Sequence, residues 1–289
     1  MNNLQIYKMI YNDVFCSTST ESFFIFLCGG ADKYHIRDKI RSQLERNELQ
    51  VLYPEDLFID MLNRDKKSDL LEYENLLANN SHIVCIICES MGSAVELGAF
   101  VQNEQLLQKL IVCINQKYAR DKSFIMMGPV KHLQKNSKSS VLVYKEKQPE
   151  VLGDELVKKF KRLQRLSRRR SEILSFEQLA AYISFIPIIT YFYKSVKRKE
   201  IHKNLKVLLK EQGELPKNYN QLFNASIKYL IKSGKMVIKF DDFRSDETLS
   251  LSPKGYMETL NILSSSLAVD KTKLQDKIRC AILQRELNN

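Results

Sequence analysis

Residues 82–107, HIVCIICESMGSAVELGAFVQNEQLL, decide the fold of the N-terminal half of the chain. Positions 82–89 are almost continuously apolar, which is typical of a parallel strand buried on both faces. A polar turn follows, and an amphipathic helix is expected over residues 94–109, with Glu96 in its first turn. In doubly wound sheets, ligands bind at the carboxyl ends of the strands. We therefore expect a substrate site that includes Glu89, Ser90, Gly92, Ser93 and Glu96.

Glu96 has two interpretations. Together with Ser93 it has the spacing of a capping box, in which the Ser and Glu side chains bond backbone amides at the helix start. It also has the chemistry of a carboxylate nucleophile, and the positive end of the helix dipole would keep it ionised for that role. The two interpretations are compatible, and the sequence alone leaves both open.

The elements around this segment alternate between strand and helix. Strands are expected over residues 23–28, 50–53, 82–89, 110–115 and 141–145. Helices are expected between them, over residues 34–47, 68–79 and 94–109. Strands separated by helices of this length indicate βαβ units, so the predicted fold class is α/β with a doubly wound parallel sheet. The sequence contains neither a glycine-rich dinucleotide fingerprint nor a phosphate-binding P-loop.

The composition predicts a cytoplasmic protein. Its 289 residues are enough for two domains of ordinary size. No apolar run is long enough to cross a bilayer, and the N-terminus lacks the features of a secretory signal. Most of the six cysteines lie in apolar strands, which fits a reducing compartment. Cys85 and Cys88 would point to opposite faces of one strand, and the four histidines are scattered, so no metal site is expected.

The net charge of +11 is unevenly distributed along the chain. Residues 1–150 contain 18 Lys and Arg against 19 Asp and Glu, whereas residues 151–289 contain 27 against 15. The first part therefore has a net charge of −1 and the second a net charge of +12. This division favours small-molecule chemistry in the first part and a polyanionic partner for the second.

Three regions are predicted: a catalytic domain over residues 1–150, a basic helical connector over residues 151–197, and a third domain over residues 198–289. The connector contains an acid-free basic segment, which is either a solvated helix face or a surface for phosphates. The candidates for nucleic-acid binding there are Lys158, Lys159, Lys161, Arg162, Arg165, Arg168, Arg169 and Arg170. A second helix, over residues 176–193, is apolar enough for a bundle core, with a kink expected at Pro187.

The third region resembles a winged-helix domain. Helices are expected over residues 200–211 and 220–232, followed by a hairpin with strands over residues 235–240 and 248–252. The segment Leu251-Ser252-Pro253-Lys254-Gly255 then leads into another helix. By this resemblance the helix over residues 220–232 is the recognition helix, and its polar candidates are Asn220, Gln221, Asn224, Ser226 and Lys228. The alternative is a dimerisation or protein-docking module.

A second group of substrate candidates lies after the first two expected strands. In the segment Tyr53-Pro54-Glu55-Asp56 the proline ends the strand, and two acids follow at its carboxyl end. A carboxylate there would accept hydrogen bonds from both hydroxyls of a ribose; the alternative is a cluster of acids at a helix start. The substrate-binding candidates at this edge are Gly29, Gly30, Tyr53, Glu55 and Asp56.

These segments resemble the nucleoside deoxyribosyltransferase-like superfamily. There a strand ends in an acidic or polar residue, a Gly-Ser/Thr turn follows, and a Glu in the next helix is the nucleophile; here these are Glu89, Gly92-Ser93 and Glu96. Over about residues 22–135 the chain is similar to retron effector proteins that carry such a domain. The segments in common are Phe26-Leu27-Cys28-Gly29-Gly30, Tyr53-Pro54-Glu55-Asp56-Leu57-Phe58, Glu74-Asn75-Leu76-Leu77-Ala78, Ser123-Phe124-Ile125 and Gly128-Pro129-Val130. One position departs from the superfamily enzymes, which usually carry an Asp where this chain has Ser90.

The resemblance implies an N-glycosidase with Glu96 as nucleophile, NAD as substrate and no cofactor. A nicotinamide leaving group is already cationic and needs little acid assistance, so Ser90 in place of Asp is compatible with this reaction. The resemblance also implies a toxin of antiviral defence, held in a complex with a reverse transcriptase and its branched RNA–DNA product (msDNA). No membrane partner is expected, and a higher-order oligomer is left open.

Two other function classes are also left open. One is a nucleoside deoxyribosyltransferase or hydrolase of salvage, against which the basic second half and the missing Asp argue. The other is a non-catalytic nucleotide-sensing regulator whose winged helix binds duplex DNA. Turnover of a substrate discriminates between the enzymes and the regulator.

Overall fold

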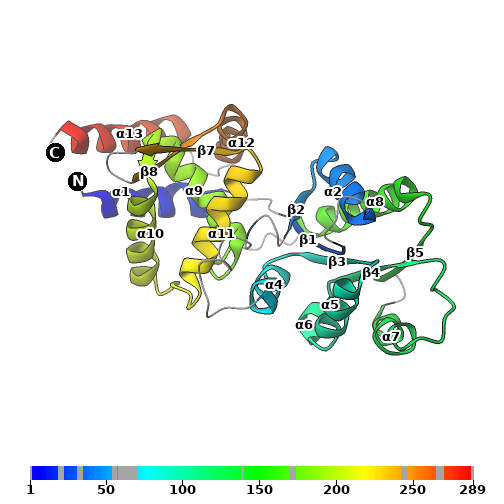
Figure 1. The fold of residues 1–289 in the computed structure, drawn as a ribbon. Coiled ribbons are helices and arrows are strands. Elements are labelled where there is room, and N and C mark those ends of the chain that lie inside the picture. The colour runs from blue at the N-terminus through cyan, green and yellow to red at the C-terminus, as the bar shows by residue number, and fades with distance from the viewer. Residues whose placement is uncertain are drawn as a thin grey trace. The chain divides into compact units, whose positions relative to one another are not determined.

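The chain forms two compact units in the computed structural model (Figure 1). The structure describes residues 2–18, 23–30, 35–53, 57, 70–137, 140–168, 174–241, 246–264 and 270–287. The α/β unit comprises residues 23–170, and the helical unit comprises residues 1–22 and 171–289. These boundaries differ from those expected at residues 150 and 197. The helix at residues 149–168 belongs to the α/β unit, and the helix at residues 3–9 belongs to the helical unit.

The α/β unit is built on a five-stranded parallel sheet in the order β2-β1-β3-β4-β5. The strands are β1 (Phe24–Cys28), β2 (Gln50–Leu52), β3 (Ile83–Cys88), β4 (Leu110–Asn115) and β5 (Val141–Tyr144). The predicted parallel α/β sheet is thus confirmed, and each strand lies within one residue of its expected bounds. In this order the winding of the sheet reverses between β1 and β3, which is the place where ligands bind in such sheets.

Helices cover both faces of this sheet (Figure 1). On one face α2 (Ile36–Arg46) packs beside α8 (Pro149–Arg168), and on the other lie α4 (Leu70–Asn79), α5 (Met91–Val101) and α6 (Glu104–Leu107). A π-helical turn, Met126–Val130, and α7 (Lys131–Asn136) connect β4 to β5. Alternate strand residues face opposite helix layers, so Cys85 lies in the core beneath α2 and α8, whereas Cys88 points to the other side, as expected.

The basic helix α8 belongs to the α/β unit. Leu152, Leu156 and Phe160 are buried in the core on the α2 side of the sheet. The end of the Gln43 side chain, on α2, lies against Gly153 of α8, where a Cβ would be 1.7 Å from its oxygen and would require that side chain to move. The helix packs here because its apolar positions recur every four residues and form a continuous face.

The helical unit is built around α9 (Leu179–Tyr193), every residue of which is buried. It continues as one helix through Pro187, where the expected kink stays a prediction, and ends at Tyr193; the residue that follows, Lys194, has a φ of +61°. The other helices of this unit are α10 (Arg198–Gln212), α11 (Tyr219–Lys232), α12 (Pro253–Ser264) and α13 (Lys271–Leu287). Among the described residues, no helix is both long and apolar enough to span a bilayer.

A small antiparallel sheet in the order β6-β8-β7 accompanies these helices. The expected hairpin is confirmed as β7 (Met236–Asp241) and β8 (Asp246–Leu251), and β6 (Ser195–Lys197) adds a third strand. The sequence did not predict β6, because three residues are too few to show an alternating pattern. Ser252 then starts α12, since its Oγ accepts a hydrogen bond from Gly255 N at 3.0 Å.

The N-terminal helix belongs to the helical unit. α1 (Asn3–Met9) packs against α10 and α13, and the short turns Ile10–Val14 and Phe15–Ser17 follow it. The Tyr193 hydroxyl donates to Asn3 Oδ1 at 3.1 Å, and the Tyr11 hydroxyl donates to Glu214 Oε1 at 2.9 Å. These bonds join segments from opposite ends of the chain, so no local pattern could have predicted them.

Lys109, immediately before β4, gives the α/β unit a pH-dependent stability. Its Nζ donates to the carbonyl oxygens of Asn79 and Ser81, and burial lowers its pKa from 10.5 to about 8. Between these pH values the unfolded chain holds a proton that the folded chain lacks, so the free energy of unfolding rises with pH. Relative to Lys109→Met, we expect the wild type to gain on the order of 1–2 kcal/mol across this interval, a figure reduced for partial exposure.

Urea unfolding of both proteins at several pH values across this interval measures the effect. The Lys109→Met protein is the control for the wild type, because all other titrating groups are common to both chains. If the difference between their free energies of unfolding stays constant with pH, the prediction is contradicted.

Candidate functional site

The carboxyl ends of β1 and β3 lie side by side where the sheet order reverses. Gly29 and Gly30 follow β1, and Glu89 follows β3. A Cβ at Gly30 would lie 2.4 Å from the His35 ring, so glycine is needed for the chain after β1 to pass the start of α2. The structure therefore brings together the candidates that follow these two strands.

Glu89 ties the end of β3 to the start of α2. Its two carboxylate oxygens accept hydrogen bonds from the backbone N–H groups of Ile36 at 2.8 Å and Arg37 at 3.0 Å. His35 Nδ1 lies 3.6 Å from one of these oxygens, and the Glu89 side chain is 8% exposed. The carboxylate thus lies at the positive end of α2 and satisfies two of its first N–H groups. Glu89 was predicted to bind substrate, but its oxygens are engaged by the protein, which gives it a positioning role.

The helix that carries Glu96 begins earlier than expected. Ser90 is the N-cap of α5: its Oγ accepts from Ser93 N at 3.2 Å, and Ser93 Oγ accepts from Ser90 N at 3.0 Å. The capping box therefore consists of Ser90 and Ser93, and the interpretation of Ser93 and Glu96 as that box was wrong. Ser93 Oγ also accepts from Glu89 N at 3.1 Å, so the serines hold the turn and Gly92 lies exposed in the first helical turn.

The single helix expected over residues 94–109 is two helices. Val101 ends α5, and the Asn103 side chain then caps α6 by accepting from the N–H groups of Gln105 and Leu106. Asn is a favoured N-cap, which explains the break.

Glu96 lies in the second turn of α5, and its Oε2 atom is shielded from solvent. The neighbouring Cys88 thiol has a raised pKa, first because it is buried and then because of the charges of Glu96 and Glu89, against a hydrogen bond with Ser93 that lowers it. Two carboxylates, Glu89 and Glu96, therefore lie near this thiol at the end of β3. A carboxylate partly withdrawn from water at such a place can stabilise positive charge that develops on a bound sugar.

Tyr53, which directly follows β2, is held by two arginines. Its buried ring lies against the guanidinium groups of Arg37 and Arg41, whose Cζ atoms lie 4.2 Å and 4.3 Å from the ring centroid. These contacts have the geometry of cation–π interactions. The acids predicted beside Tyr53 to bind a ribose, Glu55 and Asp56, lie outside the described residues.

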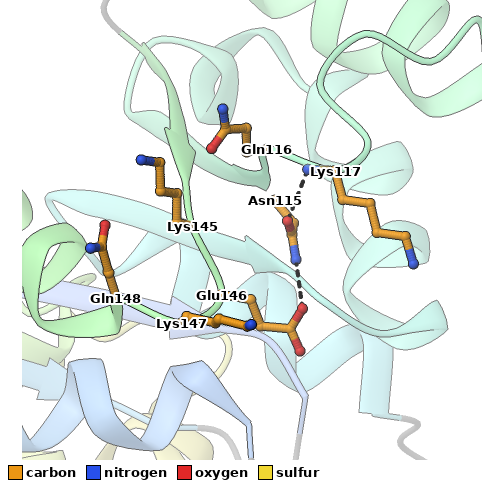
Figure 2. Close-up of a pocket in the computed structure, with 7 residues that line it drawn as sticks. All are labelled: Asn115, Gln116, Lys117, Lys145, Glu146, Lys147 and Gln148. Atoms are coloured by element: carbon orange, nitrogen blue, oxygen red, sulfur yellow. Dashed lines mark hydrogen bonds between the residues drawn. The ribbon is translucent and has the colours of Figure 1, made fainter.

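A shallow hollow of about 490 Å³, lined by polar and charged residues, lies at the carboxyl ends of β4 and β5 (Figure 2). Asn115 links its two sides, accepting from Lys117 N at 3.0 Å and donating to Glu146 Oε2 at 3.3 Å. Lys117, Lys145 and Lys147 contribute positive charge to its lining. Neighbouring strands are about 4.8 Å apart, so the hollow begins one strand away from β3 along the same edge. The sequence analysis missed these residues, although polar residues directly after apolar strands were an available signal.

On α11 the structure separates surface candidates from a core residue. Asn224 and Lys228 are partly exposed, whereas Ser226 is buried and donates to Leu222 O at 2.7 Å, so the prediction of a nucleic-acid contact by Ser226 was wrong. Asn224 Oδ1 accepts from Arg198 Nη2 at 2.8 Å, which leaves the amide NH₂ group of Asn224 as a donor.

The basic candidates of α8 differ in exposure. Lys158, Arg162 and Arg165 are exposed, Lys159 is partly buried, and Lys161 donates to Asn47 Oδ1 at 3.3 Å. The Arg168 side chain, Arg169 and Arg170 lie outside the described residues. In the part of the chain that the structure describes, no cluster of His, Cys, Asp and Glu could hold a metal ion.

Replacing Glu89 tests its positioning role. Glu89→Ala leaves two N–H groups at the start of α2 without their carboxylate, so we expect the free energy of unfolding to fall by about 1–3 kcal/mol. Urea unfolding measures this loss. Glu155→Ala removes an exposed carboxylate from α8 of the same unit and should stay within about 0.5 kcal/mol of wild type. Equal stability of the two variants would exclude the positioning role.

The chain is similar to two curated Escherichia coli proteins. It is 41% identical over 121 residues to "Retron Ec86 putative ribosyltransferase/DNA-binding protein", covering 41% of this chain and 39% of that protein. It is 34% identical over 139 residues to "Retron Ec73 putative ribosyltransferase/DNA-binding protein", covering 45% and 43%. The matches thus span about two fifths of the length of each relative. The family model described as STM3845 retron effector protein matches residues 33–239, well over half of the chain. The chain therefore belongs to this family of retron effectors.

Proposed function

We propose that the chain is a retron anti-phage effector that cleaves an N-glycosidic bond, with NAD as substrate and Glu96 as carboxylate nucleophile. The observation that carries this proposal is the placement of Glu96. Its partly shielded carboxylate lies in the second turn of α5, beside the end of β3, where the sheet order reverses. The names of both relatives include "ribosyltransferase", an activity that breaks a bond at the anomeric carbon of a ribose.

The proposed reaction breaks the bond between the anomeric carbon and the pyridinium nitrogen of nicotinamide. The electron pair of this bond returns to the nitrogen and neutralises the ring, so the leaving group needs no proton. A Glu96 oxygen stabilises the positive charge on the anomeric carbon and bonds to it. Water then attacks this carbon, releases a proton to solvent and frees the carboxylate. No second carboxylate is required as an acid, which agrees with the engagement of Glu89 at α2.

The charges along the edge of the sheet favour a cationic ring joined to phosphates. Glu89 and Glu96 bring two carboxylates to the end of β3. The lysines of the hollow at β4 and β5, Lys117, Lys145 and Lys147, offer positive charge for a diphosphate. A dinucleotide such as NAD is long enough to reach both regions, whereas a neutral nucleoside would leave the lysines unused.

We also propose a winged-helix fold for the helical unit and a complex with the retron reverse transcriptase and its branched RNA–DNA. The order of α9, β6, α10, α11 and the hairpin of β7 and β8 supports this fold, with α11 as the recognition helix. Asn224 and Lys228 lie on the partly exposed face of α11. The names of both relatives include "DNA-binding".

Glu96→Gln tests the proposed chemistry, because the amide is nearly isosteric but cannot act as a carboxylate nucleophile. The substitution also leaves the capping box of Ser90 and Ser93 untouched, so α5 should still form. In cells that express the chain with its reverse transcriptase and RNA, phage challenge should deplete NAD for the wild type and leave it intact for the variant. With purified protein, we expect nicotinamide release to fall by about 1,000-fold or more.

Glu104→Gln, at the exposed start of α6, removes the same charge from the same unit and should deplete NAD like the wild type. Depletion by Glu96→Gln would remove Glu96 from the centre of the reaction. If NAD stays constant with every chain, then NAD is not the substrate, and the nucleotide-sensing regulator becomes the better account.

A further inference from the structure

We infer that the α/β unit holds the phosphate backbone of a nucleic acid on α8, along the side chains of Lys158, Arg162 and Arg165. These three residues are called the α8 stripe. The inference rests on the nucleic-acid partner proposed above and names a surface that binds it. It places that surface on the unit that carries Glu96, in addition to any contact made by the helical unit.

The division of the chain into its compact units changes the distribution of charge. The α/β unit contains 25 Lys and Arg against 19 Asp and Glu, a net charge of +6, and the helical unit contains 20 against 15, a net charge of +5. Eight of the 25 cations lie within residues 158–170. Without these eight residues the α/β unit would contain 17 Lys and Arg against 19 Asp and Glu, a net charge of −2. The positive charge of this unit therefore comes entirely from one segment.

One side of α8 packs in the core, and the other is exposed to solvent. Leu156 and Phe160 are buried in the core, whereas all three residues of the α8 stripe are exposed. Their spacing of four and three residues keeps them on one side of the helix, over about 10 Å of its axis. Successive phosphates of one strand in a duplex rise by about 3.4 Å, so the stripe can follow roughly three phosphates. Since the core does not need these side chains, their charge is available for a partner.

Among the residues that the structure describes, the ion pairs do not involve the α8 stripe. Within the described residues, no carboxylate forms an ion pair with any of its three side chains. Cations at the start of α10 behave differently: Lys197 and Lys199 both pair with Asp246. A cation that is already paired gains little from a phosphate, whereas an unpaired one releases the counterions of the nucleic acid at little cost.

The α8 stripe lies away from the candidate site. Lys161, in the same part of α8, donates to Asn47, which follows α2 and precedes the first residue of β2. This part of α8 is therefore at the amino edge of the sheet, whereas Glu89 and Glu96 are at the carboxyl edge. A nucleic acid on the stripe would leave the carboxyl edge open to a small substrate.

A nucleic acid suits this surface better than an anionic membrane does. A helix that lies on a membrane inserts its apolar face into the lipid. The apolar face of α8, which includes Leu152, Leu156 and Phe160, is buried against the sheet. What α8 presents to a partner is charge, which is the chemistry that a phosphate backbone recognises.

The test compares two triple variants of the full chain that lose the same charge. The stripe variant carries Lys158→Gln, Arg162→Gln and Arg165→Gln. The control carries Lys122→Gln, Lys131→Gln and Lys135→Gln, at exposed positions in or before α7. Fluorescence anisotropy with a labelled DNA duplex of about 20 base pairs is measured over a range of salt concentrations, and circular dichroism checks the fold of each protein.

We expect the stripe variant to bind the duplex at least about tenfold more weakly than the control near 0.1 M salt. The slope of log K against log salt should become shallower by about 2–3 for the stripe variant and by less than about 1 for the control, because each phosphate contact contributes about 0.9. Cleavage of NAD, measured on the same samples, should be unchanged by either variant. The binding result is therefore independent of whether the glycosidase proposal holds.

Equal affinity of the two variants would overturn the inference and leave the helical unit as the nucleic-acid surface. If the wild type binds no duplex, then both the inference and the proposed partner fall. Loss of binding to phosphatidylserine vesicles in the stripe variant, with duplex binding intact, would assign the stripe to a membrane and likewise overturn the inference.

Discussion

The contact between the Glu89 carboxylate and the first amides of α2 is the constraint on which the candidate site depends. It fixes the end of β3 against the start of the helix that follows β1, across the point where the winding of the sheet reverses. The next residue, Ser90, is the N-cap of α5, so the helix begins directly after this contact. The two carboxylates at this edge thus differ: Glu89 holds the backbone at the start of α2, whereas Glu96 lies in the second turn of α5 with its Oε2 atom shielded from solvent.

The start of α5 shows where the sequence was informative and where it was not. The strand, the turn and the helix of residues 82–107 were all predicted, because a continuous apolar run followed by a polar turn is compatible with few other structures. The N-cap was predicted three residues too late. Ser90 and Ser93 are both competent caps, and Glu96 completes a capping box only with Ser93. The spacing to Glu96 favoured Ser93 as the N-cap. In the structure Ser93 Oγ accepts hydrogen bonds from the N–H groups of Glu89 and Ser90, and Ser93 lies inside the helix.

The same limit explains the domain boundaries. The sheet was predictable strand by strand, because buried parallel strands are apolar throughout. The membership of α1 in the helical unit depends on bonds such as that between Tyr193 and Asn3, which join distant segments and leave no local trace. For α8 the signal was present: Leu152, Leu156 and Phe160 recur at the spacing of a packing face. The density of basic residues drew the interpretation toward a connector, although charge on one face of a helix says nothing about the other face.

α8 also joins the two surfaces of the α/β unit to which function is assigned. It begins at Pro149, directly after Lys145, Lys147 and the other residues that line the hollow at β4 and β5, and it continues to Arg168. Its 20 residues span about 30 Å, from the edge of the sheet that carries Glu96 to the edge that carries the α8 stripe. Leu152, Leu156 and Phe160 pack this helix into the core of the α/β unit, and a close-packed core transmits strain. A nucleic acid on the α8 stripe and a nucleotide at the carboxyl edge would therefore contact the same packed unit, although the two proposed sites share no residue.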